Sequence, residues 1–150
     1  MAKKKNVLIQ LNEQSRACSG YAVAQKRALK RNTEADWVAC IAEAMGEKKG
    51  AEILSMDLRE IPGASFDFFV VCEATSGPQV RAIADEIEDQ MYVKYQMDPL
   101  HKEGYANAEW VLLDFGGVVA HIFLDSVRQH YRLEELWGDS GIKRFKGEKD

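Results

Sequence analysis

Apolar residues recur at three- and four-residue spacing in two stretches of the chain, and this spacing predicts two amphipathic helices. The first helix begins after Thr33, whose side chain can cap it, and ends at Gly46 or Gly50. The second begins at Ser76, where Ser-Gly-Pro-Gln matches a capping box with proline in the first turn. Its apolar stripe, opposed by acidic residues, consists of Val80, Ile83, Ala84, Ile87, Met91 and Tyr95.

Four runs rich in β-forming residues predict strands. The second run contains no polar residue, which is typical of a central strand that is covered on both faces. Gly116 and Gly117 separate the last two runs and indicate a tight hairpin, because such turns need a positive φ. The four runs cover residues 52–58, 68–72, 109–114 and 118–123.

The remaining segments complete the predicted domain. Residues 99–104 form a linking stretch, Asp125 caps a last helix that runs through about Tyr131, and residues 133–137 suggest one more turn. After Gly138 the chain is mostly polar, and we expect it to be frayed. The order of elements predicts an α/β (α+β) fold, with a mixed sheet of about five strands and flanking helices.

Charge divides the chain of 150 residues, whose net charge is -4, into two unequal parts. Residues 1–31 hold eight Lys or Arg side chains and one acid, Glu13, whereas residues 32–150 hold 12 basic and 23 acidic side chains. We expect a basic, largely unstructured arm at 1–31, a single acidic domain at 32–138 and a polar tail at 139–150. The acidic domain would be repelled by nucleic acid, so only the arm is left as a segment that could contact RNA.

Cysteine usage and hydropathy favour a cytoplasmic protein. The three cysteines are an odd number, widely spaced and without a C-x-x-C motif, which fits a reducing compartment. We find neither a signal-peptide pattern nor an apolar run of the ~18 residues that a membrane span needs, so no membrane partner is expected.

No set of residues predicts a metal site or a catalytic nucleophile. His101, His121 and His130 lack metal-ligand spacing, and His121, inside an apolar strand, is expected to be a hydrogen-bonded structural residue. Cys72 ends an apolar run and is expected to be a small core residue. The alternative, Cys72 beside His121 across the sheet, lacks a third orienting group.

Phosphate binding and nucleotidyl transfer have equally weak support. Thr75-Ser76-Gly77 precedes a helix where an anion could bind, but an ordinary helix cap explains the same residues and no lysine is near in sequence. Glu86 and Glu88 fit a solvated helix face better than a pair of strand carboxylates holding Mg²⁺. The sequence therefore predicts neither an enzyme nor a cofactor.

The predicted hairpin is apolar on both faces, which leaves one face open to another molecule. Alternation places Trp110, Leu112 and Asp114 on one face, and Val111, Leu113 and Phe115 on the other. Trp110 is then either a core residue or the anchor of a protein interface.

The segment from about residue 51 to residue 137 resembles the Iojap, or ribosomal silencing factor, family. The resemblance covers roughly 90 residues with few length differences and is more specific than any short motif. It is carried by Asp67-Phe68-Phe69-Val70-Val71, Ser76, Gln79-Val80, Ala82-Ile83-Ala84-Asp85, Glu103-Gly104, Trp110-Val111-Leu112-Leu113-Asp114-Phe115, Val118-Val119, His121-Ile122-Phe123 and Arg128-x-x-Tyr131-x-Leu133-Glu134-x-Leu136-Trp137.

The resemblance implies a fold like that of nucleotidyltransferases without their catalytic carboxylates. It also implies binding to large-subunit ribosomal protein fourteen, on the face where the small subunit docks. The resemblance thus implies that subunit joining is blocked and that translation is repressed when nutrients are scarce. Homodimers and, in organelles, assistance in large-subunit assembly are known in the family. Carried over by position, the partner-binding residues are Trp110, with Asp114 and Phe115 beside it.

This chain departs from the family pattern at three positions. Gly117 stands where the hairpin turn commonly has aspartate, Ala74 where a glycine follows the central strand, and Phe66 where a threonine is usual. Two alternatives to silencing stay open, which are a large-subunit assembly factor and a nucleotide-dependent transferase on the same fold.

Overall fold

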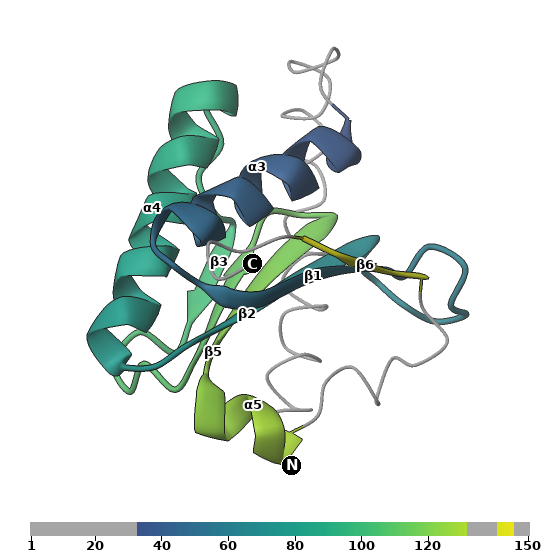
Figure 1. Cartoon of the computed structure of the whole chain (residues 1–150). Coiled ribbons are helices and arrows are strands. Elements are labelled where there is room, and N and C mark those ends of the chain that lie inside the picture. The colour runs from purple at the N-terminus through teal and green to yellow at the C-terminus, as the bar shows by residue number, and fades with distance from the viewer. Residues whose placement is uncertain (1–32, 132–140, 146–150) are drawn as a thin grey trace.

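Residues 33–131 and 141–145 are described by a computed structural model, and they form a six-stranded mixed sheet with three helices (Figure 1). Helices α3 and α4 cover one face of the sheet, and α5 lies toward the other side. The predicted fold class is confirmed. In chain order the elements are α3 (Glu34–Glu47), β1 (Ala51–Asp57), β2 (Phe68–Ala74), α4 (Gly77–Tyr95), β3 (His101–Glu103), β4 (Trp110–Asp114), β5 (Val118–Leu124), α5 (Asp125–Tyr131) and β6 (Gly141–Arg144).

Strands β2 and β5 form the parallel centre of the sheet, whose order is β3-β4-β5-β2-β1-β6. All other neighbouring strands are antiparallel. Phe69, Val70, Val71 and Cys72 of β2 are at most 1% exposed, as expected for a strand that carries packing on both faces. The prediction of a central strand from the apolar run is confirmed.

The start of α3 is fixed by a reciprocal pair of hydrogen bonds. The Thr33 hydroxyl accepts from the Asp36 backbone N–H at 3.3 Å, and the Asp36 carboxylate accepts from the Thr33 N–H at 2.9 Å. The N–H groups of the cap residue and of the third helical residue each gain a side-chain acceptor in this way. The predicted start after Thr33 is confirmed.

The start of α4 uses Gln79 differently from the predicted capping box. Ser76 Oγ accepts from the Gln79 N–H at 3.3 Å, as expected. The Gln79 carboxamide, however, accepts from the Thr75 N–H at 2.9 Å and donates to the carbonyl oxygens of Lys48 and Lys49 at 3.1 Å each. One side chain therefore fastens the α3–β1 turn to the start of α4.

The hairpin between β4 and β5 has the tight turn that the glycine pair predicts. The Phe115 N–H donates to the Val118 carbonyl at 2.9 Å, and Gly116 has a φ of +102°. Both paired segments agree with the predicted strands within one residue.

Two edge strands were not predicted. β3 lies in the expected linking stretch and pairs with β4, while β6 lies in the expected frayed tail and pairs with β1. Every residue of β6 is exposed, so its sequence carries no alternation of apolar and polar positions. Backbone pairing along the outer edge of β1, rather than side-chain burial, holds β6 in place.

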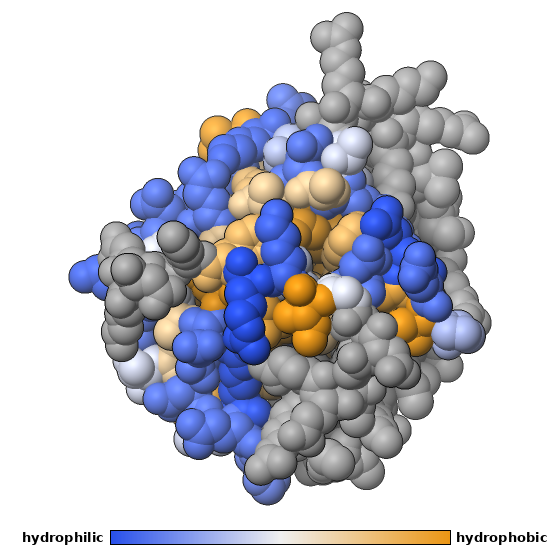
Figure 2. Space-filling view, turned by 45° about the vertical axis from the view of Figure 1, so that its right-hand side comes forward, coloured by the Kyte–Doolittle hydropathy of each residue, from blue (hydrophilic) through white to orange (hydrophobic). Residues whose placement is uncertain are grey.

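Few large apolar side chains of the described residues reach the surface. In the face shown in Figure 2, orange areas are divided by hydrophilic side chains. The large apolar side chains that are exposed among the described residues are Tyr92, Val93 and Ile142. No described helix combines the length and apolar character that crossing a membrane requires.

Candidate functional site

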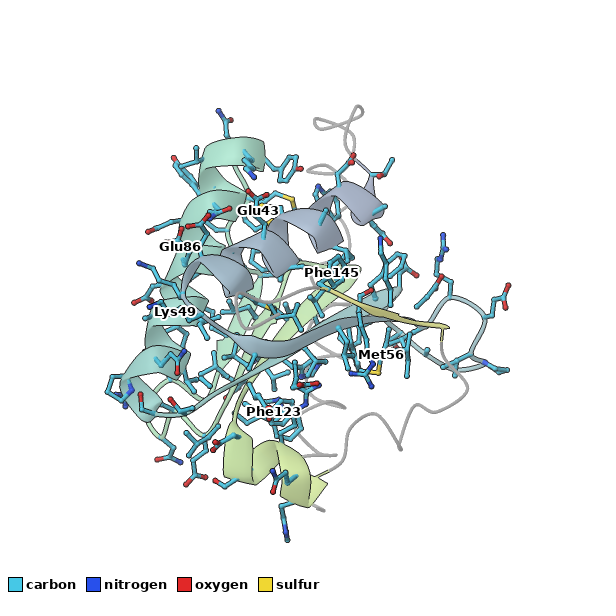
Figure 3. The ribbon with its side chains drawn as sticks, viewed as in Figure 1. Glu43, Lys49, Met56, Glu86, Phe123 and Phe145 are labelled. Atoms are coloured by element: carbon cyan, nitrogen blue, oxygen red, sulfur yellow. The ribbon has the colours of Figure 1, made fainter. Side chains whose placement is uncertain are left out.

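The face of the sheet that points away from α3 and α4 carries an aromatic cluster, which we call the Trp110 face. Met56 of β1 and Phe123 of β5 lie on this side in Figure 3, whereas Phe145 lies on the α3 side. Pairing of β4 with β5 places Trp110 opposite Phe123 and Leu112 opposite His121. The buried apolar residues of this face are Leu54, Met56, Leu58, Phe66, Phe69, Val71, Trp110, Leu112, Val119 and Phe123.

Ring contacts that begin at Trp110 link three neighbouring strands, β4, β5 and β2. The indole stacks on Phe123 with ring centroids 4.9 Å apart, and Nε1 donates to His121 Nδ1 at 3.0 Å. His121 in turn meets Phe69 of β2 edge to face at 4.4 Å. Such contacts orient aromatic rings beyond what apolar burial alone would do.

His121 is a neutral, structural histidine, as the sequence predicts. The ring is fully buried, and burial lowers its pKa to about 3. Because Nδ1 accepts the indole N–H, the ring proton is assigned to Nε2. Nε2 has no hydrogen-bond partner among the described residues. The ring therefore accepts one hydrogen bond and carries no charge near neutral pH.

The alternative of a Cys72–His121 pair does not fit the sheet register. Cys72 belongs to the core under α3 and α4, while His121 lies on the Trp110 face beside Val71. Adjacent residues of a strand point to opposite faces, so the thiol and the imidazole are separated by the sheet. Burial also raises the pKa of the Cys72 thiol, which keeps it protonated and unreactive.

Of the three predicted partner-binding residues, the structure places two on one face and the third on the other. Trp110 and Asp114 lie on the Trp110 face, at opposite ends of β4. Phe115 packs in the core under the helices. Trp110, Asp114 and Phe115 are 3%, 0% and 1% exposed, and the Asp114 carboxylate accepts from the Gly116 N–H at 2.8 Å. Their role in binding stays a prediction.

An acidic corner beside the hairpin turn is a feature that sequence reasoning missed. A Cβ at Gly117 would lie 2.5 Å from Glu34 Oε1 and 3.1 Å from Asp67 Oδ2. Two carboxylates from distant parts of the chain therefore stand where the family commonly has a turn aspartate. No local pattern could reveal this, because only the fold brings residues 34, 67 and 117 together.

A cation borders the same corner. Arg59 donates to the Asp57 carboxylate at 2.7 Å and lies 4.9 Å from the centre of the Phe68 ring. This hydrogen bond lowers the pKa of Asp57. The corner is therefore acidic but partly balanced by one guanidinium group.

The other candidate sites correspond to structural roles. At Thr75-Ser76-Gly77, the Thr75 N–H is already bound by the Gln79 side chain and the Gln79 N–H by the Ser76 side chain, so the ordinary helix-cap interpretation is confirmed. Glu86 accepts from Gln90 one turn along the same helix. Glu88 is not simply solvated, because it accepts from Lys102 at 3.1 Å and from Tyr105 at 2.6 Å. Within residues 33–131 and 141–145, no three His, Cys, Asp or Glu side chains are placed to hold a metal ion.

Comparison with known proteins defines the class of the chain. The model of the family described as "Ribosomal silencing factor during starvation" matches residues 30–150. The chain belongs to this family. The match begins before and ends after the segment on which the sequence resemblance rests.

Individual relatives agree with this assignment. The "Ribosomal silencing factor RsfS" of Bacillus subtilis is 40% identical over 101 residues, which cover 67% of this chain and 84% of the relative. A crystal structure of a Chromobacterium violaceum protein superimposes with a TM-score of 0.67 at 31% identity, covering 71% of this chain and 88% of the other. The mouse protein named "Mitochondrial assembly of ribosomal large subunit protein 1" is 34% identical over 73 residues, which cover 47% of this chain and 32% of that protein.

Proposed function

We propose that this protein is a ribosomal silencing factor that binds the large subunit through large-subunit ribosomal protein fourteen. Bound there, it occupies the surface where the small subunit docks, keeps the subunits apart and represses translation when nutrients are limiting. The observation that carries the proposal is the family match, which spans all the described elements of the fold. The protein acts in the cytoplasm, where translating ribosomes are found, and it needs no cofactor.

Charge supports a basic protein partner. Residues 32–150 hold 23 acidic and 12 basic side chains. Ribosomal proteins are generally basic, so an acidic domain is attracted to them and association is accelerated. The acidic corner at Gly117 adds two carboxylates beside the hairpin that we assign to the contact.

Trp110 serves as the apolar anchor of the contact, with Asp114 shaping the turn and Phe115 holding it against the helices. Because the indole is only 3% exposed in the free chain, a partner reaches it only when the groups packed on the Trp110 face move aside. Buried aromatic side chains at interfaces often contribute several times more than their neighbours. Binding should therefore be more sensitive to Trp110 than to a tryptophan elsewhere.

Co-sedimentation with purified ribosomal subunits tests the proposal. The protein should travel with free large subunits and be absent from translating ribosomes. Trp110→Phe keeps an aromatic ring for stacking on Phe123 but loses the hydrogen bond to His121. Trp37→Phe is the matched control, because Trp37 is 2% exposed and belongs to α3, where it packs in the core on the opposite face of the sheet.

The expected result is weaker large-subunit binding for Trp110→Phe and unchanged binding for Trp37→Phe at the same salt concentration. Equal binding by both variants, with Trp110→Ala also unaffected, would show that the hairpin assignment is wrong. Absence of the wild-type protein from the large-subunit fraction would refute the function itself.

A role in large-subunit assembly is the second candidate, and the name of the mouse relative favours it. The partner would be the same and only the timing would differ. Depletion of the protein should then lead to accumulation of immature large subunits, whereas a pure silencing factor would leave the maturation of the large subunit unchanged.

We further propose that the protein is not an enzyme. The separation of Cys72 from His121 and the side-chain capping of α4 support this view. Calorimetry with nucleoside triphosphates and Mg²⁺ should detect no binding, and saturable binding in the micromolar range would favour the nucleotide-dependent transferase instead.

A further inference from the structure

A shallow, open cleft runs along the outer side of α4, the long helix on the left of Figure 1. It combines acidic side chains with exposed apolar ones, and it extends to the loop that follows the helix. Its lining residues are Asp85, Glu88, Asp89, Tyr92, Val93 and Asp98.

Three of the four carboxylates in the cleft are without a cation in the described part of the chain. Glu88 is bound by Lys102 and Tyr105, and Asp85 lies 3.3 Å from the Tyr105 hydroxyl. Asp89 and Asp98 have no such partner among residues 33–131 and 141–145. The cleft therefore presents uncompensated negative charge.

Exposed apolar surface lies beside this charge. Tyr92 is 56% exposed and Val93 is 79% exposed, although both belong to a helix whose other face is fully buried. A cleft of this composition suits a segment that carries several positive charges and an apolar side chain.

The chain itself contains such a segment in its basic arm. Residues 26–31 read Lys-Arg-Ala-Leu-Lys-Arg, with four positive charges around Leu29. The arm ends at the start of α3, where the Asp36 carbonyl accepts from the Tyr95 hydroxyl at 3.4 Å. Tyr95 follows Tyr92 by one helical turn, so the arm enters the fold close to the end of α4 that carries the cleft.

We propose that residues 26–31 dock into the α4 cleft of the same chain. The lysine and arginine side chains pair with Asp89 and Asp98, and Leu29 covers Tyr92 and Val93. Because the segment is tethered within a few residues of the fold, its effective concentration at the cleft is on the order of millimolar, and weak contacts suffice.

This contact is separate from the proposed ribosomal contact. The cleft lies on α4, which covers the helix side of the sheet, while Trp110 lies on the opposite face. If substitutions in the cleft do not release the arm, the docking proposal fails while the proposed large-subunit binding is unaffected.

A nitroxide label next to the basic segment of the full-length chain tests the proposal. The label is attached in a Gln25→Cys, Cys18→Ser protein, since Cys40 and Cys72 are 3% and 0% exposed and do not react. Amide signals near the label are broadened in NMR spectra. Those of Tyr92 and Val93 should be broadened at low salt, and the effect should fall roughly threefold or more in 1 M salt, where the Debye length is about 3 Å.

The pair Asp89→Asn and Asp98→Asn should reduce the broadening to a similar extent. The matched control, Glu47→Gln with Glu60→Gln, removes two exposed acids outside the cleft and should leave the broadening unchanged. The proposal is overturned if Tyr92 and Val93 are not broadened, or if the broadening persists in the Asp89 and Asp98 variant. Broadening of an unlabelled, isotope-enriched chain by a labelled one would identify a second copy as the occupant and would also overturn it.

Discussion

The buried imidazole of His121 should make the stability of the domain fall as the pH drops below neutrality. The pKa of the ring is lowered to about 3 in the folded chain, whereas an unfolded histidine titrates near 6.5. Between these two values the unfolded chain binds a proton that the folded chain does not. Stability contributed by the neutral ring is therefore complete above about pH 6.5 and is lost progressively toward pH 3.

The magnitude follows from this difference in pKa. Each pH unit between the two values corresponds to about 1.4 kcal/mol, so the free energy of unfolding should fall by about 2 kcal/mol between pH 7 and pH 5 from this residue alone. This loss is a sizeable part of the 5–15 kcal/mol, roughly, by which small domains are stable.

Urea unfolding at pH 7, 6 and 5, followed by tryptophan fluorescence, measures the effect against a His121→Asn variant. The asparagine oxygen can accept the Trp110 N–H in place of Nδ1, and the side chain does not titrate. The variant should be less stable at pH 7 because it fills less of the core. Its deficit should shrink by about 2 kcal/mol at pH 5, since the carboxylates titrate in both proteins and cancel. Parallel curves for the two proteins would refute the reasoning.

Three further sets of substitutions are expected to have specific effects. Gly104→Ala, at a φ of +90° with its new Cβ pressed into a backbone carbonyl of β4, should lower the free energy of unfolding by about 2–4 kcal/mol, whereas Gly63→Ala, at +81° in open space, should cost only about 1–2 kcal/mol. Equal losses in urea unfolding would contradict the clash. Gln79→Ala removes the hydrogen bonds that link the end of α3 to the start of α4, and it should lower the free energy of unfolding by roughly 1 kcal/mol in the same assay. An unchanged free energy of unfolding would contradict a stabilising role for this link. Gly117→Asp adds a third carboxylate to the acidic corner and should lower the melting temperature. Adding Glu34→Gln to this variant should restore part of the lost melting temperature. If the added Glu34→Gln has no effect, charge repulsion is not the cause.

Patterns within one segment were predictable from the sequence. The start of α4, the central strand and the glycine-pair hairpin follow from periodicity, capping chemistry and the need for positive φ. β3 and β6 were missed because short edge strands are held by backbone pairing, which any side chain permits. Neither strand contains a buried residue, so no alternation of buried and exposed positions marks it in the sequence.

Of the candidate site, only the two faces of β4 could be predicted, from the alternation of side chains along a strand. The division of β4 into two faces correctly separates Trp110 from Phe115. The hydrogen bond from Trp110 to His121 and the acidic corner at Gly117 depend on strand register and on a helix that arrives from another part of the chain. Physical contacts of that kind follow from topology rather than from local composition.

The parallel pairing at the centre of the sheet has a consequence for the order in which the chain folds. Phe68 pairs with Val118, fifty residues later, so the central ladder cannot form until nearly all of the domain is available. Closing a loop of this size costs entropy before any contact repays it, which slows folding. On a translating ribosome, α3, β1, β2 and α4 leave the tunnel before β5 is synthesised. Until then, their apolar surfaces are incompletely covered. A factor of this family would thus depend for its own maturation on uninterrupted elongation through its last third.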